Sequence, residues 1–384
     1  MPASGNVRAG KHAAGASHAA RRQQARLPFG RVKPKDLSIL ARQFSTLVDA
    51  GVSMARCLTV LAEQTESARL RAVVQDLRRE IEGGATLSTA MGRHPGVFPT
   101  LATGLVRAGE VGGALEQTLD RLAAFLEKDL ELRRKVHSAM AYPALVMLTA
   151  FGIVLFLVTF ILPKFAILFK DLGLTKMPGM TQALMDASHF LTRGFPARQA
   201  LLLAAAAGIL LGGKALLRTR CGRRLYDRAK LHVPVFGKLS RRIAIARFAR
   251  TFGTLLVSGV PVLQAMEAVA GAVDNTVFAE AILKARTAIS EGESIGPPLR
   301  RSGVFPPMVV HMVTIGEETG ALDGMLAKVA DFYEQEVDAA LQSLTAALEP
   351  VMIVSLGGVV GFIVIAMLLP LVDAITHLTD AGGQ

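Results

Sequence analysis

Two long apolar stretches without any charged residue constrain this sequence more than any other feature. They run from Pro143 to Pro163 and from Pro350 to Val372, and neither contains Asp, Glu, Lys, Arg or His. An α-helix of about 20 apolar residues crosses the hydrocarbon core of a bilayer, which is about 30 Å thick. We therefore predict transmembrane helices at 143–163 and 350–372.

A third apolar stretch lies between these two. Ala200 to Gly213 is uncharged but short, so by length alone it could be a buried helix. Extension to Leu217 adds one charged residue, Lys214, whose long side chain can reach the lipid headgroups. We predict a transmembrane helix at 198–217, which gives the chain three spans.

The distribution of basic residues predicts the orientation in the membrane. Residues 214–250 carry twelve Lys or Arg and one acidic residue, whereas the tail at 373–384 has no Lys or Arg. Basic segments next to spans stay in the cytoplasm. We therefore expect a multi-pass membrane protein with its N-terminus in the cytoplasm and its C-terminus outside. Residues 164–197 would form an external connection and 373–384 an external tail.

Composition excludes several other classes of protein. Hydrophobic residues make up 51% of the chain, charged residues 19%, and the mean hydropathy is +0.40. Aromatic residues make up 5% and Trp is absent, which argues against nucleic-acid modules that stack bases on aromatic rings. Cys57 and Cys221 are the only cysteines, too few for a disulfide framework and without metal-ligand spacing.

The net charge of +12 comes from separate blocks. Residues 1–35 hold eight Lys or Arg and no acidic residue, and we predict a disordered basic tail at 1–32. We expect the basic juxtamembrane linker at 218–242 to face anionic lipids and the cytoplasm. Its face consists of seven arginines: Arg218, Arg220, Arg223, Arg224, Arg228, Arg241 and Arg242.

The chain contains an internal repeat of about 120 residues. At an offset of 208 residues, Phe44, Gly51, Ile81 and Gly84 match Phe252, Gly259, Ile289 and Gly292. At an offset of 207, Val97-Phe98-Pro99, Pro143 and Pro163 match Val304-Phe305-Pro306, Pro350 and Pro370. Apolar residues recur at helical spacing in each copy, without strand-like alternation. We predict an all-α membrane protein with two tandem homologous cytoplasmic bundles, at 33–142 and 243–349, of about six helices each.

The most specific local motif is a glycine–glutamate turn that occurs once in each repeat. The first copy contains Gly109, Glu110 and Gly113, and the second contains Gly316, Glu317 and Gly320. One reading is structural: the last glycine ends a helix with positive φ, and the acid lies near the N-terminus of the next helix. The other reading is an exposed turn that docks a partner. Glu116 and Asp323 occupy equivalent positions nearby, so the second reading includes a cation held by the carboxylates of the turn. The number of carboxylates is low for a hard cation, and we predict no metal site.

No motif supports catalysis. Gly208 to Ala215 approximates a phosphate-binding loop, but Ala215 replaces the hydroxyl that holds Mg²⁺ and no strand precedes it. The eight histidines form no metal-binding or catalytic set. The predicted spans lack the ionisable residues of a proton-coupled transporter, apart from Lys214 at an edge. We expect no enzyme activity and no cofactor.

In combination, these features resemble the inner-membrane platform family of type IV pilus assembly (PilC-like) and type II secretion (GspF-like). The resemblance covers residues 33–376. The segments 316–323 and 329–333, which read GEETGALD and VADFY, are more similar to the pilus branch. The first copy has Val111-Gly112 where the second has the more family-like Glu318-Thr319. The Arg-rich leader is not a feature of the family.

This resemblance implies a platform without enzyme activity that couples a cytoplasmic hexameric ATPase to the growth or removal of a fibre. Its implied partners are pilins or pseudopilins, other inner-membrane assembly proteins, anionic lipids and further copies of itself, but no nucleic acid. The equivalent platform of a type II secretion system is the alternative. A small transporter would need ionisable groups in its spans, and a sensor would need a larger external domain.

Overall fold

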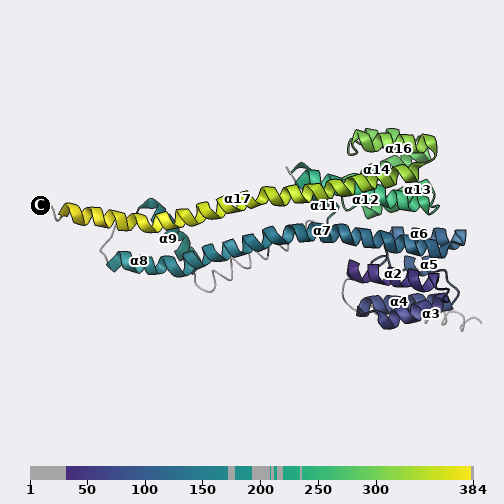
Figure 1. Cartoon of the computed structure of the whole chain (residues 1–384), viewed down its shortest axis with the longest axis horizontal. Helices are drawn as coiled ribbons and strands as arrows, with labels where there is room; N and C mark the ends of the chain where they lie inside the picture. The colour runs from purple at the N-terminus through teal and green to yellow at the C-terminus, as the bar shows by residue number, and fades with distance from the viewer. Residues whose placement is uncertain are drawn as a thin grey trace, which may run out of the picture. The chain divides into compact units, whose positions relative to one another are not determined.

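The computed structural model describes residues 32–171, 178–192, 219–233 and 236–381, together with Gly208, Gly212 and Gly213 (Figure 1). Every regular element among these residues is a helix, which confirms the all-helical prediction for the described part of the chain. The predicted basic tail and most of the predicted span at 198–217 lie outside the described residues.

The described residues group into two compact units. The first contains residues up to Glu131, with Arg247–Asp274 and Ala279–Val329. The second contains Leu132–Ala246, Asn275–Phe278 and the residues from Ala330 onward. Both repeats contribute helices to the first unit, so the two units do not correspond to the two repeats. The predicted domain boundaries at 142 and 243 therefore stay predictions.

The first repeat consists of short amphipathic helices that lead into one long helix. The helices are α2 (Pro34–Asp49), α3 (Met54–Gln64), α4 (Ala68–Glu82), α5 (Leu87–Gly92), α6 (Thr100–Gly112) and α7 (Leu115–Phe156). Leu37, Leu40 and Phe44 are buried at helical spacing on α2, and Leu61 and Leu105 are fully buried on α3 and α6. The side chains of Ser67 and Thr86 cap α4 and α5 by accepting backbone N–H bonds.

The second repeat has the same order of elements. Its core in the first unit includes Phe248, whose ring centroid lies 5.7 Å from that of Phe252 and 4.8 Å from that of Phe305. The helices are α12 (Phe236–Val257), α13 (Val262–Ala272), α14 (Thr276–Ser290), α15 (Gly296–Arg301), α16 (Pro307–Thr319) and α17 (Leu322–Ala381). α11 (Arg220–His232) precedes them.

Within the first unit the two repeats contact each other. α6 of the first repeat packs against α13 of the second, and the two helices lie side by side in Figure 1. Arg121 Nη1 donates to the carbonyl of Val257 at 2.8 Å. Arg247 Nη2 lies 3.1 Å from Asp129 Oδ1, and its Nη1 bonds Asp274. Apolar packing and ion pairs therefore both join the repeats.

Two helices of the described chain are long and apolar enough to cross a membrane, within Leu115–Phe169 and Leu322–Val372. They contain the predicted first and third spans. The first continues from α7 through a π-helical turn, η1 (Leu157–Ile161), into α8 (Leu162–Asp171). The second is α17, which includes Pro350 and Pro370. Each repeat therefore runs into its apolar span without a break in the helix.

In the second unit the two long helices are joined before their apolar segments begin. Leu239 of α12 and Val337, Leu341 and Leu344 of α17 form a buried cluster, against which Leu132 and other residues of α7 pack. Lys135 Nζ lies 2.7 Å from Asp338 Oδ2 across the same junction. These contacts hold α7 and α17 together at the base of the apolar segments.

Candidate functional site at the glycine–glutamate turns

The last glycine of each motif ends a helix in the left-handed conformation. Gly113 follows α6 with φ 68°, and Gly320 follows α16 with φ 69°. A residue with a Cβ is strained at such φ values, which explains why glycine occupies both positions. The turn that the sequence predicts is present in both repeats.

The glutamate of each motif accepts hydrogen bonds at the start of the preceding short helix. The Glu110 carboxylate accepts bonds from the Ser88 backbone N–H at 3.2 and 3.3 Å and from the Ser88 hydroxyl at 2.5 Å, in the first turn of α5. The Glu317 carboxylate accepts from the Ile295 N–H at 2.8 and 2.9 Å, at the N-terminus of α15. Each carboxylate satisfies backbone donors that the helix leaves unpaired.

This arrangement corrects one detail of the structural reading. The sequence places the acid near the following helix, α7 or α17, because that helix begins only a few residues later. Glu110 and Glu317 instead lie within α6 and α16, and their side chains reach sideways to the helix packed alongside. Sequence distance to the next helix is therefore a poor guide to the partner of these carboxylates.

The first glycine of each motif allows two helices to approach closely. A Cβ at Gly109 would lie 2.0 Å from Thr118 Oγ1 of α7, and one at Gly316 would lie 2.8 Å from the Cα of Leu322. Both distances are below van der Waals contact. The motif therefore has three structural roles, namely close helix contact, capping of a neighbouring helix and a left-handed turn.

Exposed residues at the turns differ between the repeats. Val111 is 86% exposed, and its counterpart Glu318 is also exposed. Beside the first turn, a hydrogen bond and charge repulsion from Asp49 raise the pKa of Glu116. No group of three or more His, Cys, Asp or Glu suited to a metal ion occurs among the residues that the structure describes.

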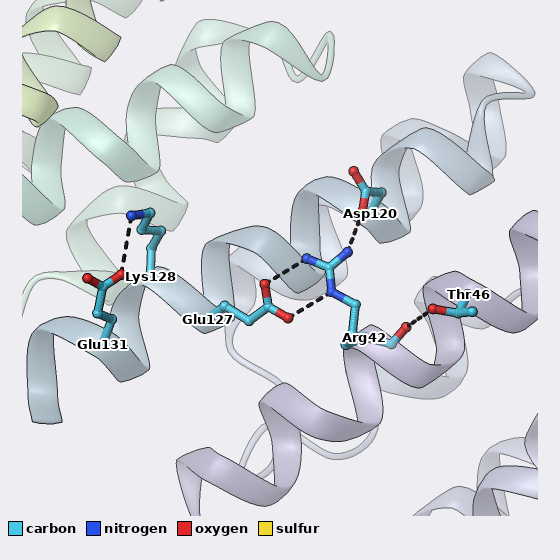
Figure 2. Close-up of polar contacts among 6 residues, drawn as sticks. All are labelled: Arg42, Thr46, Asp120, Glu127, Lys128 and Glu131. Atoms are coloured by element: carbon cyan, nitrogen blue, oxygen red, sulfur yellow. Dashed lines mark hydrogen bonds and ion pairs between the residues drawn. The ribbon is translucent and has the colours of Figure 1, made fainter.

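The sequence reading missed an ion-pair cluster centred on Arg42. The guanidinium of Arg42, on α2, contacts both Glu127 oxygens at 2.7 Å and Asp120 Oδ1 at 2.6 Å, both on α7 (Figure 2). Its hydrogen bond to Glu127 lowers the pKa of that carboxyl and raises the pKa of Arg42. A signal exists in the sequence, because Arg250 and Glu334 occupy the counterpart positions in the second repeat.

The predicted basic face is only partly described by the structure. Arg218 and the side chain of Arg220 lie outside the described residues. Arg223, Arg224 and Arg228 are exposed on α11, and Arg241 is exposed on α12. Arg242 instead pairs with Glu336 at 2.7 Å.

One acidic side chain anchors α11 within the second unit. Asp227 is buried, and its Oδ2 accepts from the Thr276 N–H at 2.9 Å. Leu225 and Tyr226 remain 67% and 52% exposed on the same helix. α11 therefore presents basic and apolar side chains together.

Part of the predicted external connection packs against the predicted spans. In α9 (Gly179–Thr192), which lies beside α8 and α17 in Figure 1, Thr181 and Ser188 are buried. The Thr181 hydroxyl donates to the Ala366 carbonyl at 2.5 Å, and Ser188 donates to the Val158 carbonyl at 2.7 Å.

Both carbonyls lie where the helical hydrogen-bond pattern is interrupted. Pro370, four residues after Ala366, has no N–H to donate, and Val158 lies within the π-helical turn η1. The hydroxyls of α9 therefore supply hydrogen bonds where apolar surroundings leave few other donors.

Comparison with known families identifies the repeats. The family model described as "Type II secretion system (T2SS), protein F" matches the chain twice, at residues 40–163 and 248–370. The chain belongs to the T2SS protein F family. The two matched segments differ in position by the same 208 and 207 residues as the internal repeat, which is thereby confirmed.

Relatives of this T2SS protein F family member include proteins from both branches. It is 46% identical over 346 residues to the "Type IV pilus assembly protein PilC" of Thermus thermophilus, covering 90% of this chain and 84% of that protein. It is 43% identical to PilC of Myxococcus xanthus, covering 89% and 81%. It is 34% identical to the "Type II secretion system protein F" of Vibrio cholerae, covering 89% and 83%. The PilC-like branch is therefore favoured, as predicted.

The role of α9 leads to a testable expectation. The double substitution Thr181→Val and Ser188→Ala removes both hydroxyls, at a cost of about 1 kcal/mol for each lost hydrogen bond. We expect faster amide hydrogen exchange across residues 178–192 in the purified protein. Thr159→Val is the matched control, because its hydroxyl bonds Leu155 of its own helix. Equal exchange in both variants would show that these hydroxyls do not hold α9.

Proposed function

We propose that this chain is the inner-membrane platform protein of a type IV pilus assembly machine. The observation that carries the proposal is the match over about nine-tenths of the chain to relatives named as type IV pilus assembly proteins. The platform has no enzyme activity of its own. It couples a cytoplasmic hexameric ATPase to the insertion of pilins into the fibre, or to their removal from it.

The long helices supply a route for this coupling. α7 and α17 each begin at a glycine–glutamate turn and continue into an apolar segment. At 1.5 Å per residue, the 42 residues of α7 extend about 60 Å. A displacement applied at the turns by the ATPase would therefore reach the spans through continuous helix. The exposed Val111 beside the first turn is the proposed docking point for the ATPase.

The remaining partners follow from the proposed location. With the N-terminus in the cytoplasm and the C-terminus outside, the basic residues of α11 and α12 would face anionic headgroups and the cytoplasm. The exposed Leu225 and Tyr226 would enter the headgroup region beside them. The apolar spans would contact pilin helices, further copies of the platform and other inner-membrane assembly proteins.

Deletion of this chain from its host tests the proposal. We expect a strain without the chain to lose surface pili, as measured by shearing and immunoblotting of the pilin, and the full-length chain to restore them. Secretion of type II substrates should be unchanged. Loss of secretion with intact pili would contradict the proposal and support the platform of a type II secretion system, which relatives at 34–36% identity keep as the second candidate.

ATPase coupling needs a separate test. The full-length chain in detergent should co-purify with the assembly ATPase, and deletion of residues 36–140 should abolish this. Deletion of residues 2–31, which precede the family match at residue 40, is the matched control and should preserve it. Retained co-purification after the first deletion would contradict the proposed docking of the ATPase on the first repeat.

A further inference from the structure

The internal repeat allows the exposure of one helix face to be compared between α6 of the first repeat and α16 of the second. α6 and α16 correspond at an offset of 207 residues, and α6 packs against α13 within the first unit. Four positions of α6 lie on one stripe at spacing i, i+3, i+4 and i+7, and all four are buried or half-buried. They are Leu101, Gly104, Leu105 and Ala108.

The counterpart positions on α16 are more exposed in every case. Met308 is 40% exposed and Ile315 is 45% exposed, His311 is exposed and Met312 is half-buried. Leu101, the counterpart of Met308, is 1% exposed. We call Met308, His311, Met312 and Ile315 the α16 stripe.

The exposure of the α16 stripe is not a general loosening of this helix. On the opposite face, Val313 is as fully buried as its counterpart Val106. The difference is confined to the stripe, as expected if α13 covers that face of α6. Apolar side chains that remain exposed along one helix face mark an interaction surface.

We propose that the α16 stripe binds the α16 stripe of a second copy of this chain, with the two helices antiparallel about a two-fold axis. This inference goes beyond the proposed function and does not depend on the pilus assignment. The equivalent face of the first repeat, on α6, already packs against α13, so it joins the two repeats within one chain.

The residues fit pairing of α16 with α16 better than pairing of α16 in one copy with α3, the counterpart of α13, in another. The contact of α13 with α6 uses small residues, since the Cβ position of Gly271 lies 3.7 Å from Thr100 Oγ1. On α3, the counterpart of α13, Glu63 replaces this glycine and is exposed. A second α16 stripe instead offers the apolar side chains of Met308, Met312 and Ile315, with His311 among them, in the two-fold arrangement most common among homodimers.

Charge favours the antiparallel arrangement. α16 begins at Pro307, where the helix dipole is positive, and the exposed Glu318 lies in its last turn. Antiparallel pairing brings Glu318 of each copy near the positive end of the other helix. Parallel pairing would place the two Glu318 side chains together.

Disulfide cross-linking of the full-length chain in membranes tests this geometry. Residues 311 and 312 lie at the middle of the stripe, so His311→Cys and Met312→Cys should each cross-link to themselves across the axis after oxidation. The background is Cys221→Ser, and Cys57 stays because it is fully buried. We expect at least fivefold more covalent dimer, at twice the 40.8 kDa mass of the chain, than for Val111→Cys, a control on α6 at a position that is 86% exposed.

A second pair of variants tests the direction of the helices. Met308→Cys and Ile315→Cys should cross-link to each other when co-expressed, and neither should do so alone. Adding Ile315→Lys to His311→Cys should reduce the dimer at least fivefold, with helical circular dichroism unchanged. The proposal is overturned if His311→Cys and Met312→Cys give no more dimer than Val111→Cys, or if they cross-link only to a different protein. Self-cross-linking of Met308→Cys would overturn the antiparallel arrangement.

Discussion

Replacement of Arg247 by methionine is expected to destabilise the first unit by about 3 kcal/mol. The Arg247 side chain is 11% exposed and joins α12 to Asp129 of α7 and to Asp274 beyond α13. Methionine retains much of the apolar volume but removes the charge, so Asp129, whose side chain is 21% exposed, loses its ion pair with Arg247. We expect the apparent Tm of the full-length protein in detergent to fall by roughly 5 °C or more.

Arg42→Met is the matched control for this prediction. Arg42 also bridges two carboxylates, but its side chain is 39% exposed and those of Asp120 and Glu127 are 62% and 45% exposed. Water can hydrate these groups when the pair is broken, so the cost should be about 1 kcal/mol or less. Equal losses of Tm in the two variants would show that burial does not determine the importance of these ion pairs.

Helices and the repeat could be predicted from the sequence because their signals are local or periodic. Leu37, Leu40 and Phe44 mark the buried face of α2 through their spacing alone. The register of Gly113 and Gly320 reveals both the repeat and the turn, because only glycine tolerates the conformation that ends these helices.

Contacts between the repeats could not be predicted in the same way. Arg247 has Ile39 as its counterpart in the first repeat, so the internal comparison gives no signal for its ion pairs. The partners of Glu110 and Glu317 depend on which helix packs alongside. The pairing of Thr181 with Ala366 requires α9 to fold back against α17, which no local pattern in the sequence encodes.

The sharpest steric constraint in the glycine–glutamate motif lies at its first glycine. Gly109→Val places a branched side chain where even a Cβ would lie 2.0 Å from Thr118 Oγ1. Thr118 is buried and bonds the Leu115 carbonyl at 2.9 Å, so it cannot turn away without cost. We expect a destabilisation of about 3 kcal/mol from overpacking, measured by thermal unfolding, and a loss of function in the piliation assay.

Gly104→Ala is the control, because it lies on the same helix and nothing is within 4 Å of its Cβ position. Alanine favours a helix over glycine by up to about 1 kcal/mol, so this variant should be as stable as the native chain or more so. If Gly109→Val were equally well tolerated, close contact between α6 and α7 would not explain this glycine. The presence of glycine at position 109 would then be explained by a partner that approaches the turn closely. Co-purification of the ATPase with Gly109→Val would decide whether that partner is the ATPase.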